Sequence, residues 1–342
     1  MKLAALGYYG FSNLGDEAVL AGIRAALATE RRFDGAEFLA LSNDPAETAR
    51  LHAGVSATDR WAWRGAWDAL AGTDLFIFGG GSLLQDATSV KSVLWYFLMA
   101  SLARKRAKKV LWWGQGIGPL RSSASRKLVR ILANSADALT VRDEKSAALL
   151  KEIGARGSME IVADPAFALT PSPNFGGERG GTILAPRPWK ELTPDWSLPE
   201  RAPLPLVRLP MHLPGDREAL GGSAAGLYDW KERGASVTDV LGRIEAAELV
   251  VAMRLHALIF AARCATPFVA VSYDPKVDAL AEAAGQSDAL IPVSRLTRKS
   301  LAGIVERVLD TAPARRESLK GFAQAQSALA LRPAKIASGL FG

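Results

Sequence analysis

The sequence is poor in the residues that form disulfides and metal centres. Its 342 residues include one cysteine and three histidines. The single cysteine, Cys264, excludes an intramolecular disulfide and disfavours a cysteine-rich metal site. Its apolar neighbours predict a thiol buried in the core rather than a nucleophile. The histidines are far apart in sequence and lack the spacing of metal ligands, so we predict no metal.

Long apolar runs are also missing. None reaches the roughly 20 residues of a membrane-spanning helix, and the apolar stretch at the N-terminus is too short for a signal peptide. The longest candidate, Val93–Ala103, is followed by the basic run Arg104–Lys109. We therefore predict a cytoplasmic protein. The basic run is interpreted as a solvated helix end, with contact to an acidic membrane at the inner face of the plasma membrane as the alternative.

The net charge of +7 favours anionic partners. These include phosphorylated substrates, acidic membrane surfaces and nucleic acids. Nucleic acid is the weakest of the three, because the basic residues are scattered and no recognition motif is present. We predict no nucleic-acid partner.

Strand and helix patterns alternate along the chain, which is typical of an α/β protein with mostly parallel sheets. Residues 170–181 are rich in proline, glycine, serine and asparagine, which predicts a linker. We expect two Rossmann-like doubly wound domains facing a cleft, at residues 1–170 and 180–316, and a C-terminal segment 317–342 that packs back on the first domain. The predicted strands are Lys2–Leu6, Glu37–Leu41, Asp74–Phe78, Val110–Trp113, Ala138–Val141, Glu160–Val162, Thr182–Ala185, Leu206–Leu209, Leu249–Met253 and Pro267–Ser272.

Three glycine-rich segments of the first half follow predicted strands, namely Gly7–Glu17, Phe78–Asp86 and Gly114–Pro119. None has the spacing of a dinucleotide fingerprint or of a phosphate-binding P-loop. Glycines at such positions let the backbone approach a ligand closely. We therefore interpret the three segments as ligand-binding loops at one sheet edge. Their predicted contact residues are Asn13, Gly15, Asp16, Glu17, Gly80, Gly81, Ser82, Asp86 and Gln115.

The second half places basic residues after its strands. Arg254 and His256 interrupt an otherwise apolar run, Leu249–Ala262, and a buried guanidinium needs a counter-charge. That counter-charge is either a carboxylate of the protein or a bound anion. Arg187 and His212 also follow predicted strands, which predicts a cluster of two arginines and two histidines suited to carboxylate or phosphate. The third histidine, His52, is interpreted as a surface residue.

These segments together resemble the polysaccharide pyruvyltransferase family, and most closely its bacterial cell-wall branch, the CsaB type. The resemblance covers nearly the whole chain and depends on the order and number of matching segments. They are Gly7–Phe11 with Asn13, Gly15–Ala18, Gly79–Asp86, Gly114–Pro119, Val141–Asp143 with Ser146, Ala163–Pro165, Met253–Ile259 and Ser272–Val277. The last segment adds Tyr273 and Lys276 as predicted substrate contacts. The chain departs from the family pattern at Ala185–Trp189, where Arg187 is kept but its neighbours differ.

The resemblance implies a glycosyltransferase-B-like fold and transfer of pyruvate from phosphoenolpyruvate to two hydroxyls of a sugar as a cyclic ketal. In the cell-wall branch the acceptor is an N-acetylmannosamine unit of a polymer that anchors surface-layer proteins. We expect Arg187 and Arg254 to bind the anionic groups of phosphoenolpyruvate, which is a co-substrate rather than a cofactor. His256 is the expected acid and His212 the secondary candidate. Asp16, Glu17 and Asp86 are expected to hold or deprotonate the acceptor.

Two other functions fit the same residues. One is a nucleotide-sugar glycosyltransferase of the same fold, because a fold does not fix a reaction. The other is a non-catalytic module that binds an anion or a glycan. The donor that is consumed distinguishes the first, and ligand binding without phosphate release distinguishes the second.

Overall fold

The computed structural model describes all residues except 88, 176–178, 190–194 and 221–224. Three residues of the predicted linker therefore lie outside the described part. The chain divides into two compact units. Unit 1 contains Met1–Phe11, Asp16–Leu169 and Gln326–Gly342, and unit 2 contains Ser12–Gly15 and Thr170–Ala325.

Unit 1 is built on a parallel sheet of seven strands in the order β3-β2-β1-β4-β5-β6-β7. The strands are β1 (Lys2–Leu6), β2 (Glu37–Ser42), β3 (Val55–Asp59), β4 (Leu75–Leu84), β5 (Lys109–Ile117), β6 (Ala138–Val141) and β7 (Met159–Ile161). The helices are α1 (Leu14–Leu27), α2 (Pro45–Leu51), α3 (Trp63–Ala69), α4 (Val90–Arg106), α5 (Ser123–Ser135) and α6 (Glu144–Glu152).

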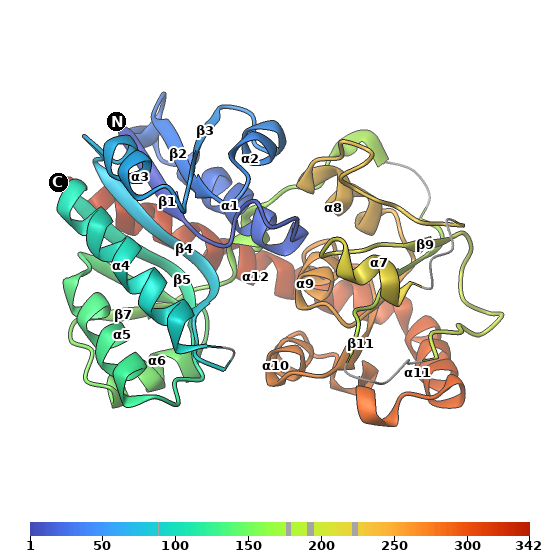
Figure 1. The fold of residues 1–342 in the computed structure, drawn as a ribbon. Helices are drawn as coiled ribbons and strands as arrows, with labels where there is room; N and C mark the ends of the chain where they lie inside the picture. Colours follow the sequence, from blue (N-terminus) through green and yellow to red (C-terminus); the bar gives the residue numbers. More distant parts are fainter. Residues whose placement is uncertain (88, 176–178, 190–194, 221–224) are drawn as a thin grey trace. The chain divides into compact units, whose positions relative to one another are not determined.

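Helices cover both faces of this sheet, as the near-continuous apolar strands require. One face packs against α4 and α5, with Val93 and Val129 in the shared core. The other packs against α1 and the end of α12 (Ala312–Gly339), with Ile23 and Ala337 in its core. Figure 1 shows the teal α4 and the green α5 on one side of the strands. This layering confirms the predicted α/β class.

Two strands of unit 1 are longer than predicted, so two of the predicted ligand loops are wrong in part. β4 continues through its three glycines to Leu84, and β5 continues to Ile117. Gly79 pairs with Trp113, and a register shift follows Gly81. The prediction ended both strands at glycine because glycine weakens strand interiors. Here both strands are central, and the glycines of β4 stay in the sheet through pairing with β5, since the pairing of β4 with β1 ends at Phe78.

Unit 2 has a parallel sheet of five strands in the order β12-β11-β10-β8-β9. The strands are β8 (Thr182–Ala185), β9 (Leu206–Arg208), β10 (Leu249–Ala252), β11 (Phe268–Ser272) and β12 (Leu290–Pro292). The helices are α7 (Gly215–Ala219), α8 (Val237–Glu245), α9 (Leu255–Arg263), α10 (Pro275–Ala283) and α11 (Arg298–Asp310). The predicted thiol burial is confirmed: Cys264 is buried, donates to the Leu241 carbonyl at 3.5 Å, and burial raises its pKa to about 12.

Candidate active site

The carboxyl edge of the unit 2 sheet collects the basic residues predicted from the sequence. Four neighbouring strands, β9, β8, β10 and β11, all point the same way. The residues that follow them are His212 after β9, Arg187 after β8, Arg254 and His256 after β10, and Tyr273 and Lys276 after β11. The crevice outside this edge is the usual ligand site of open α/β sheets. The site is therefore centred on the loops after four adjacent strands.

Arg254 is held by a carboxylate of the protein. Its Nε donates to both carboxylate oxygens of Asp216, at 3.1 and 2.9 Å, and its Nη2 donates to Oδ1. Asp216 is fully buried, whereas the Arg254 side chain is 17% exposed. The sequence left open whether a carboxylate of the protein or a bound anion balances Arg254, and in the structure it is the carboxylate of Asp216. This bidentate pair fixes the guanidinium at the start of α9.

Asp216 also organises the loop that carries His212. Its Oδ2 accepts from the backbone N–H groups of Met211 at 3.1 Å and of His212 at 2.9 Å. Its own backbone N–H donates to the His212 carbonyl at 3.0 Å. One buried carboxylate therefore connects the loop after β9 with the arginine after β10.

His256 lies in the first turn of α9 against a segment from the N-terminal part of the chain. Ser12–Gly15 belongs to unit 2, and a side chain at position 15 would collide with the imidazole of His256. Only glycine leaves room for the ring there. Leu14 N–H donates to the Met211 carbonyl at 2.8 Å, and Asn13 forms an antiparallel bridge with His212.

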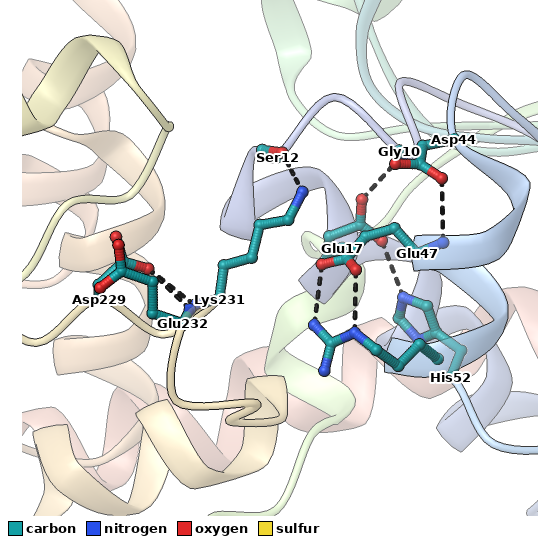
Figure 2. A network of polar contacts seen from close by, with 10 residues as sticks. Gly10, Ser12, Glu17, Asp44, Glu47, His52, Asp229, Lys231 and Glu232 are labelled. Atoms are coloured by element: carbon teal, nitrogen blue, oxygen red, sulfur yellow. Dashed lines mark hydrogen bonds and ion pairs between the residues drawn. The ribbon is translucent and has the colours of Figure 1, made fainter.

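The same segment has two further contacts inside unit 2. Leu213 N–H donates to the Ser12 carbonyl at 3.0 Å, and Lys231 Nζ donates to Ser12 Oγ at 3.1 Å, as Figure 2 shows. Asn13 Oδ1 accepts from Gly15 N–H at 3.1 Å and so stabilises the turn. The segment is thus a strap, residues Ser12–Gly15, that lies along both histidine-bearing loops.

Arg187 lies among aromatic rings. Its guanidinium is 4.5 Å from the ring centre of Tyr273 and 5.8 Å from that of Trp189. The two rings are themselves 5.0 Å apart. Its hydrogen bond goes to the Pro188 carbonyl, and no carboxylate of the described residues forms an ion pair with it. The positive charge of Arg187 is therefore not balanced by a described carboxylate, whereas that of Arg254 is balanced by the buried Asp216.

In unit 1, Glu17 and His52 form a buried pair, so the interpretation of His52 as a surface residue is wrong. His52 Nε2 lies 2.8 Å from Glu17 Oε2, and both side chains are buried. Glu17 Oε1 accepts from Gly10 N–H at 2.9 Å (Figure 2). Glu17 was predicted to contact the acceptor, but both of its carboxylate oxygens bind groups of the protein.

Asp86 and Gln115 also bind the backbone of unit 1. Asp86 accepts from Arg121 N–H at 2.7 Å and Ser122 N–H at 2.8 Å. Burial alone would raise its pKa, but these hydrogen bonds outweigh burial and lower it. Gln115 is fully buried, and its Nε2 donates to the Phe78 and Gly79 carbonyls at 2.9 and 2.6 Å.

The remaining predicted residues of unit 1 lie where β4 meets α1. A side chain on Gly80 would press on Val19, and Gly81 has φ of +89° with Asp16 Oδ1 beside it. Ser82 is half-buried and accepts from Arg142 Nη2 at 2.9 Å. Gly80 therefore allows close packing within unit 1.

A sequence model of polysaccharide pyruvyl transferases matches residues 13–275, which is more than half of the chain. The chain belongs to the polysaccharide pyruvyl transferase family. No curated protein matches it by sequence.

Solved structures similar to this family member show its fold. The UDP-GlcNAc 2-epimerase from Neisseria meningitidis bound to UDP-GlcNAc has a TM-score of 0.58 and 10% identity, and each chain covers 100% of the other. The S. aureus MnaA–UDP structure has a TM-score of 0.57 and 14% identity over 97% of this chain and 94% of that one. Anabaena Alr3699/HepE with UDP-glucose has a TM-score of 0.56 and 12% identity over 99% of each. The fold is thus glycosyltransferase-B-like, with two Rossmann-like domains.

Sequence reasoning missed two buried charged residues that hold loops at the carboxyl edges of the two sheets. Asp216 gave no signal, because an aspartate in a short helix is common and its partner Arg254 lies far along the chain. Arg60 follows β3, a strand that was not predicted, and is buried with its guanidinium 4.0 Å from the ring centre of Trp95. Its Nη1 donates to the Gly7 carbonyl at 2.7 Å. The available signal was a tryptophan-rich stretch, residues 61–67, directly after Arg60.

Within residues 1–342, apart from the four undescribed stretches, no group of three or more histidine, cysteine, aspartate or glutamate side chains is placed to hold a metal ion. No helix in that same part of the chain is long and apolar enough to cross a bilayer.

Proposed function

We propose that this enzyme transfers pyruvate from phosphoenolpyruvate to a sugar of a cell-wall polysaccharide, as a cyclic ketal, with release of phosphate. The family gives the transferase class. The observation that supports the donor is the placement of Arg187, Arg254, His212 and His256 after three adjacent strands of unit 2, namely β8, β10 and β9. Phosphoenolpyruvate has a carboxylate and a phosphate, which are the two groups that arginine binds best.

The anionic groups are assigned by how each cation is balanced. Arg187 has no carboxylate partner among the described residues, so we assign it the group with the larger charge, the phosphate. Arg254 uses two nitrogens on Asp216, and its Nη1 is assigned to the donor carboxylate. The start of α9 adds a positive dipole end, which favours an anion.

The chemistry then requires one acid and two sugar hydroxyls. His256 protonates the methylene carbon of phosphoenolpyruvate, which places positive charge on the central carbon. The first hydroxyl attacks this carbon and loses its proton. The bond from carbon to the phosphate oxygen breaks, phosphate leaves, and the second hydroxyl attacks and loses its proton. The products are one ketal and one phosphate, with no water added or released.

The strap at Ser12–Gly15 supports this role for His256. A general acid must be held within reach of the atom that it protonates. The bare face of Gly15 lets the strap lie flat against the imidazole, and the hydrogen bond from Leu14 anchors the strap to the His212 loop. His212 bridges Asn13 through its backbone, so its proposed role is to contact substrate secondarily or to act as acid in place of His256.

The acceptor assignment is narrower than the one made from the sequence. Glu17 and Asp86 are buried with their oxygens on protein donors, so we propose that they shape unit 1 rather than touch the sugar. Asp16 and Ser82 are only partly buried, and we keep them as proposed acceptor contacts; the proposed acceptor is N-acetylmannosamine of a cell-wall polymer. Pyruvylation of such a polymer would give surface-layer proteins an anionic attachment group.

The test is phosphate release from phosphoenolpyruvate in the presence of a panel of sugar acceptors, with mass spectrometry of each product. A product that gains one pyruvate less one water supports the proposal and identifies the acceptor. Parallel reactions contain labelled UDP-sugars in place of phosphoenolpyruvate. Consumption of a UDP-sugar with no phosphate released from phosphoenolpyruvate would instead establish a glycosyltransferase. Thermal stabilisation by phosphoenolpyruvate without turnover across the panel would indicate a binding module.

A further inference from the structure

Helix α4 is apolar on its outer face as well as on its inner face. Val93 and Met99 pack into the core of unit 1. On the opposite side, Leu94 and Leu98 are 44% and 42% exposed, and Val90 is one turn before them. A surface helix of a soluble domain ordinarily has a polar outer face. The outer face of α4 therefore calls for a partner that buries it.

The neighbouring helix α3 extends this apolar surface with tryptophans. Trp61, Trp63 and Trp67 are 50%, 43% and 37% exposed. Trp61 packs against Trp95 of α4 with ring centres 5.0 Å apart, and the Arg106 guanidinium of α4 is 4.4 Å from the ring centre of Trp67. Helices α3 and α4 are therefore in contact, and Figure 1 draws them next to each other in unit 1.

We name these residues the tryptophan–leucine surface, which comprises Trp61, Trp63, Trp67, Val90, Leu94 and Leu98. They make up six of the eleven exposed large hydrophobic side chains of the described residues. The other five are spread over the termini, α5, β7, a loop of unit 2 and α12. The apolar exposure is thus concentrated at one place, which marks an interaction surface rather than ordinary scatter.

The charge around this surface is mainly positive, because the exposed Asp59 and Asp68 of the tryptophan segment are outnumbered by Arg64 and the cations of α4. Helix α4 carries Lys91, Arg104, Lys105 and Arg106 and has no acidic residue. Arg104 pairs with Asp137, whereas Lys91 and Lys105 are exposed at opposite ends of the helix. Cations beside an exposed apolar face are complementary to a partner that is both apolar and negatively charged.

We propose that the tryptophan–leucine surface docks unit 1 on the surface of an anionic lipid bilayer. Tryptophan prefers the headgroup region because its ring is apolar and its N–H is polar. Leucines of the same face reach the acyl boundary, and the lysines contact lipid phosphates. The binding is peripheral. Membrane binding requires no catalysis, so it can be tested independently of the proposed function.

The experiment is co-sedimentation of the full-length protein with two kinds of vesicle, pure phosphatidylcholine and phosphatidylcholine with about a third phosphatidylglycerol. We expect binding to the anionic vesicles to exceed binding to the neutral ones by at least tenfold and to weaken when salt rises from about 0.1 to about 0.5 M. Equal binding to both kinds of vesicle, or binding to neither, would overturn the proposal.

Matched variants locate the contact. Leu94→Ser should lower partition to anionic vesicles by about tenfold, whereas Leu329→Ser, on α12 with a similar 40% exposure, should leave it unchanged. Lys91→Glu together with Lys105→Glu should lower it by at least about 25-fold, since each cation near an anionic surface is worth about fivefold. Lys299→Glu on α11 is the control for charge.

Two results would contradict this assignment. One is an equal loss of binding in Leu94→Ser and Leu329→Ser. The other is a dimer by light scattering that Leu94→Ser converts to monomer while vesicle binding is absent, because the surface would then join two copies of the chain. The charge variants alter exposed residues only, so they keep the test valid if Leu94→Ser fails to fold.

Discussion

The two parallel sheets of this chain use the polar residues at their carboxyl edges differently. In unit 1, Glu17, Asp86 and Gln115 bind backbone groups or a buried histidine of the same unit. In unit 2, Arg187 lies against aromatic rings without a carboxylate of the described residues. His256 lies in the first turn of a helix. The first edge mainly holds its own loops together, whereas the second presents cations.

The contrast shows that glycine-rich loops and polar side chains after strands are not by themselves a ligand site. A polar group counts toward binding only when it keeps a donor or acceptor that the protein has not already satisfied, because a buried polar group must find a partner somewhere. The four predictions below test whether the division between the two edges is real.

The largest effect is expected from His256→Asn. Loss of the proposed acid should lower kcat for phosphate release by about 10²- to 10⁴-fold while the melting temperature stays within a few degrees. His212→Asn is the matched comparison, and it should have the smaller effect. If His212→Asn is the more damaging of the two, the acid lies on the loop after β9. Turnover within a few-fold of wild type in His256→Asn would remove the assignment.

Arg254→Met should cost about 3 to 5 kcal/mol of unfolding free energy, because it leaves the fully buried Asp216 without its counter-charge. Urea denaturation measures this loss. Asp216→Asn should cost less, since the Arg254 side chain keeps partial contact with water. Were Arg254 mainly a donor contact, Asp216→Asn would leave stability intact and raise KM for phosphoenolpyruvate.

Glu17→Gln should destabilise unit 1 by about 2 kcal/mol through weaker bonds to His52 and Gly10. KM for the acceptor should stay unchanged. Asp16→Asn, at the adjacent and less buried position, should do the reverse: raise KM with little change in stability. The opposite pattern would place Glu17 at the acceptor and end the contrast between the two edges.

Asp86→Asn should have the smallest effect, about 1 kcal/mol at neutral pH. Burial raises the pKa of Asp86, but the Arg121 and Ser122 amides lower it more. A folded-state pKa below the unfolded one contributes stability that is present above the unfolded pKa and lost as pH falls through the folded pKa. Denaturation from pH 7 toward acid should therefore show wild type and variant converging. The exposed Asp34→Asn variant should show no such convergence, and parallel curves for Asp86→Asn would disprove the role of its charge.

The sequence predicted the elements whose patterns were strong. The apolar run before Arg254 placed β10 within a residue of its observed end, and that placement put Arg254 and His256 at the right sheet edge. Weak patterns failed. β3 (Val55–Asp59) is an edge strand with polar residues, and it was not predicted. Its omission concealed the position of Arg60.

The pairing of side chains could not be predicted for a different reason. The partner of a buried charge is chosen by the folded chain, and nothing local to Asp216 or His52 indicates the residue it meets. His52 was interpreted as exposed because its segment of the first domain looked variable. Burial came from Glu17, which lies on α1 and far away in sequence.

The strap at Ser12–Gly15 has a consequence for evolution and engineering. Positions 15 and 256 are encoded far apart in the gene, yet the ring of His256 occupies the space that a side chain at Gly15 would fill. A chimaera that joins the first 169 residues of one homologue to the remainder of another would combine a strap and a histidine that never coexisted. Crossovers in this family should therefore be tolerated best when residues 12–15 travel with the second domain, although they are encoded within the first.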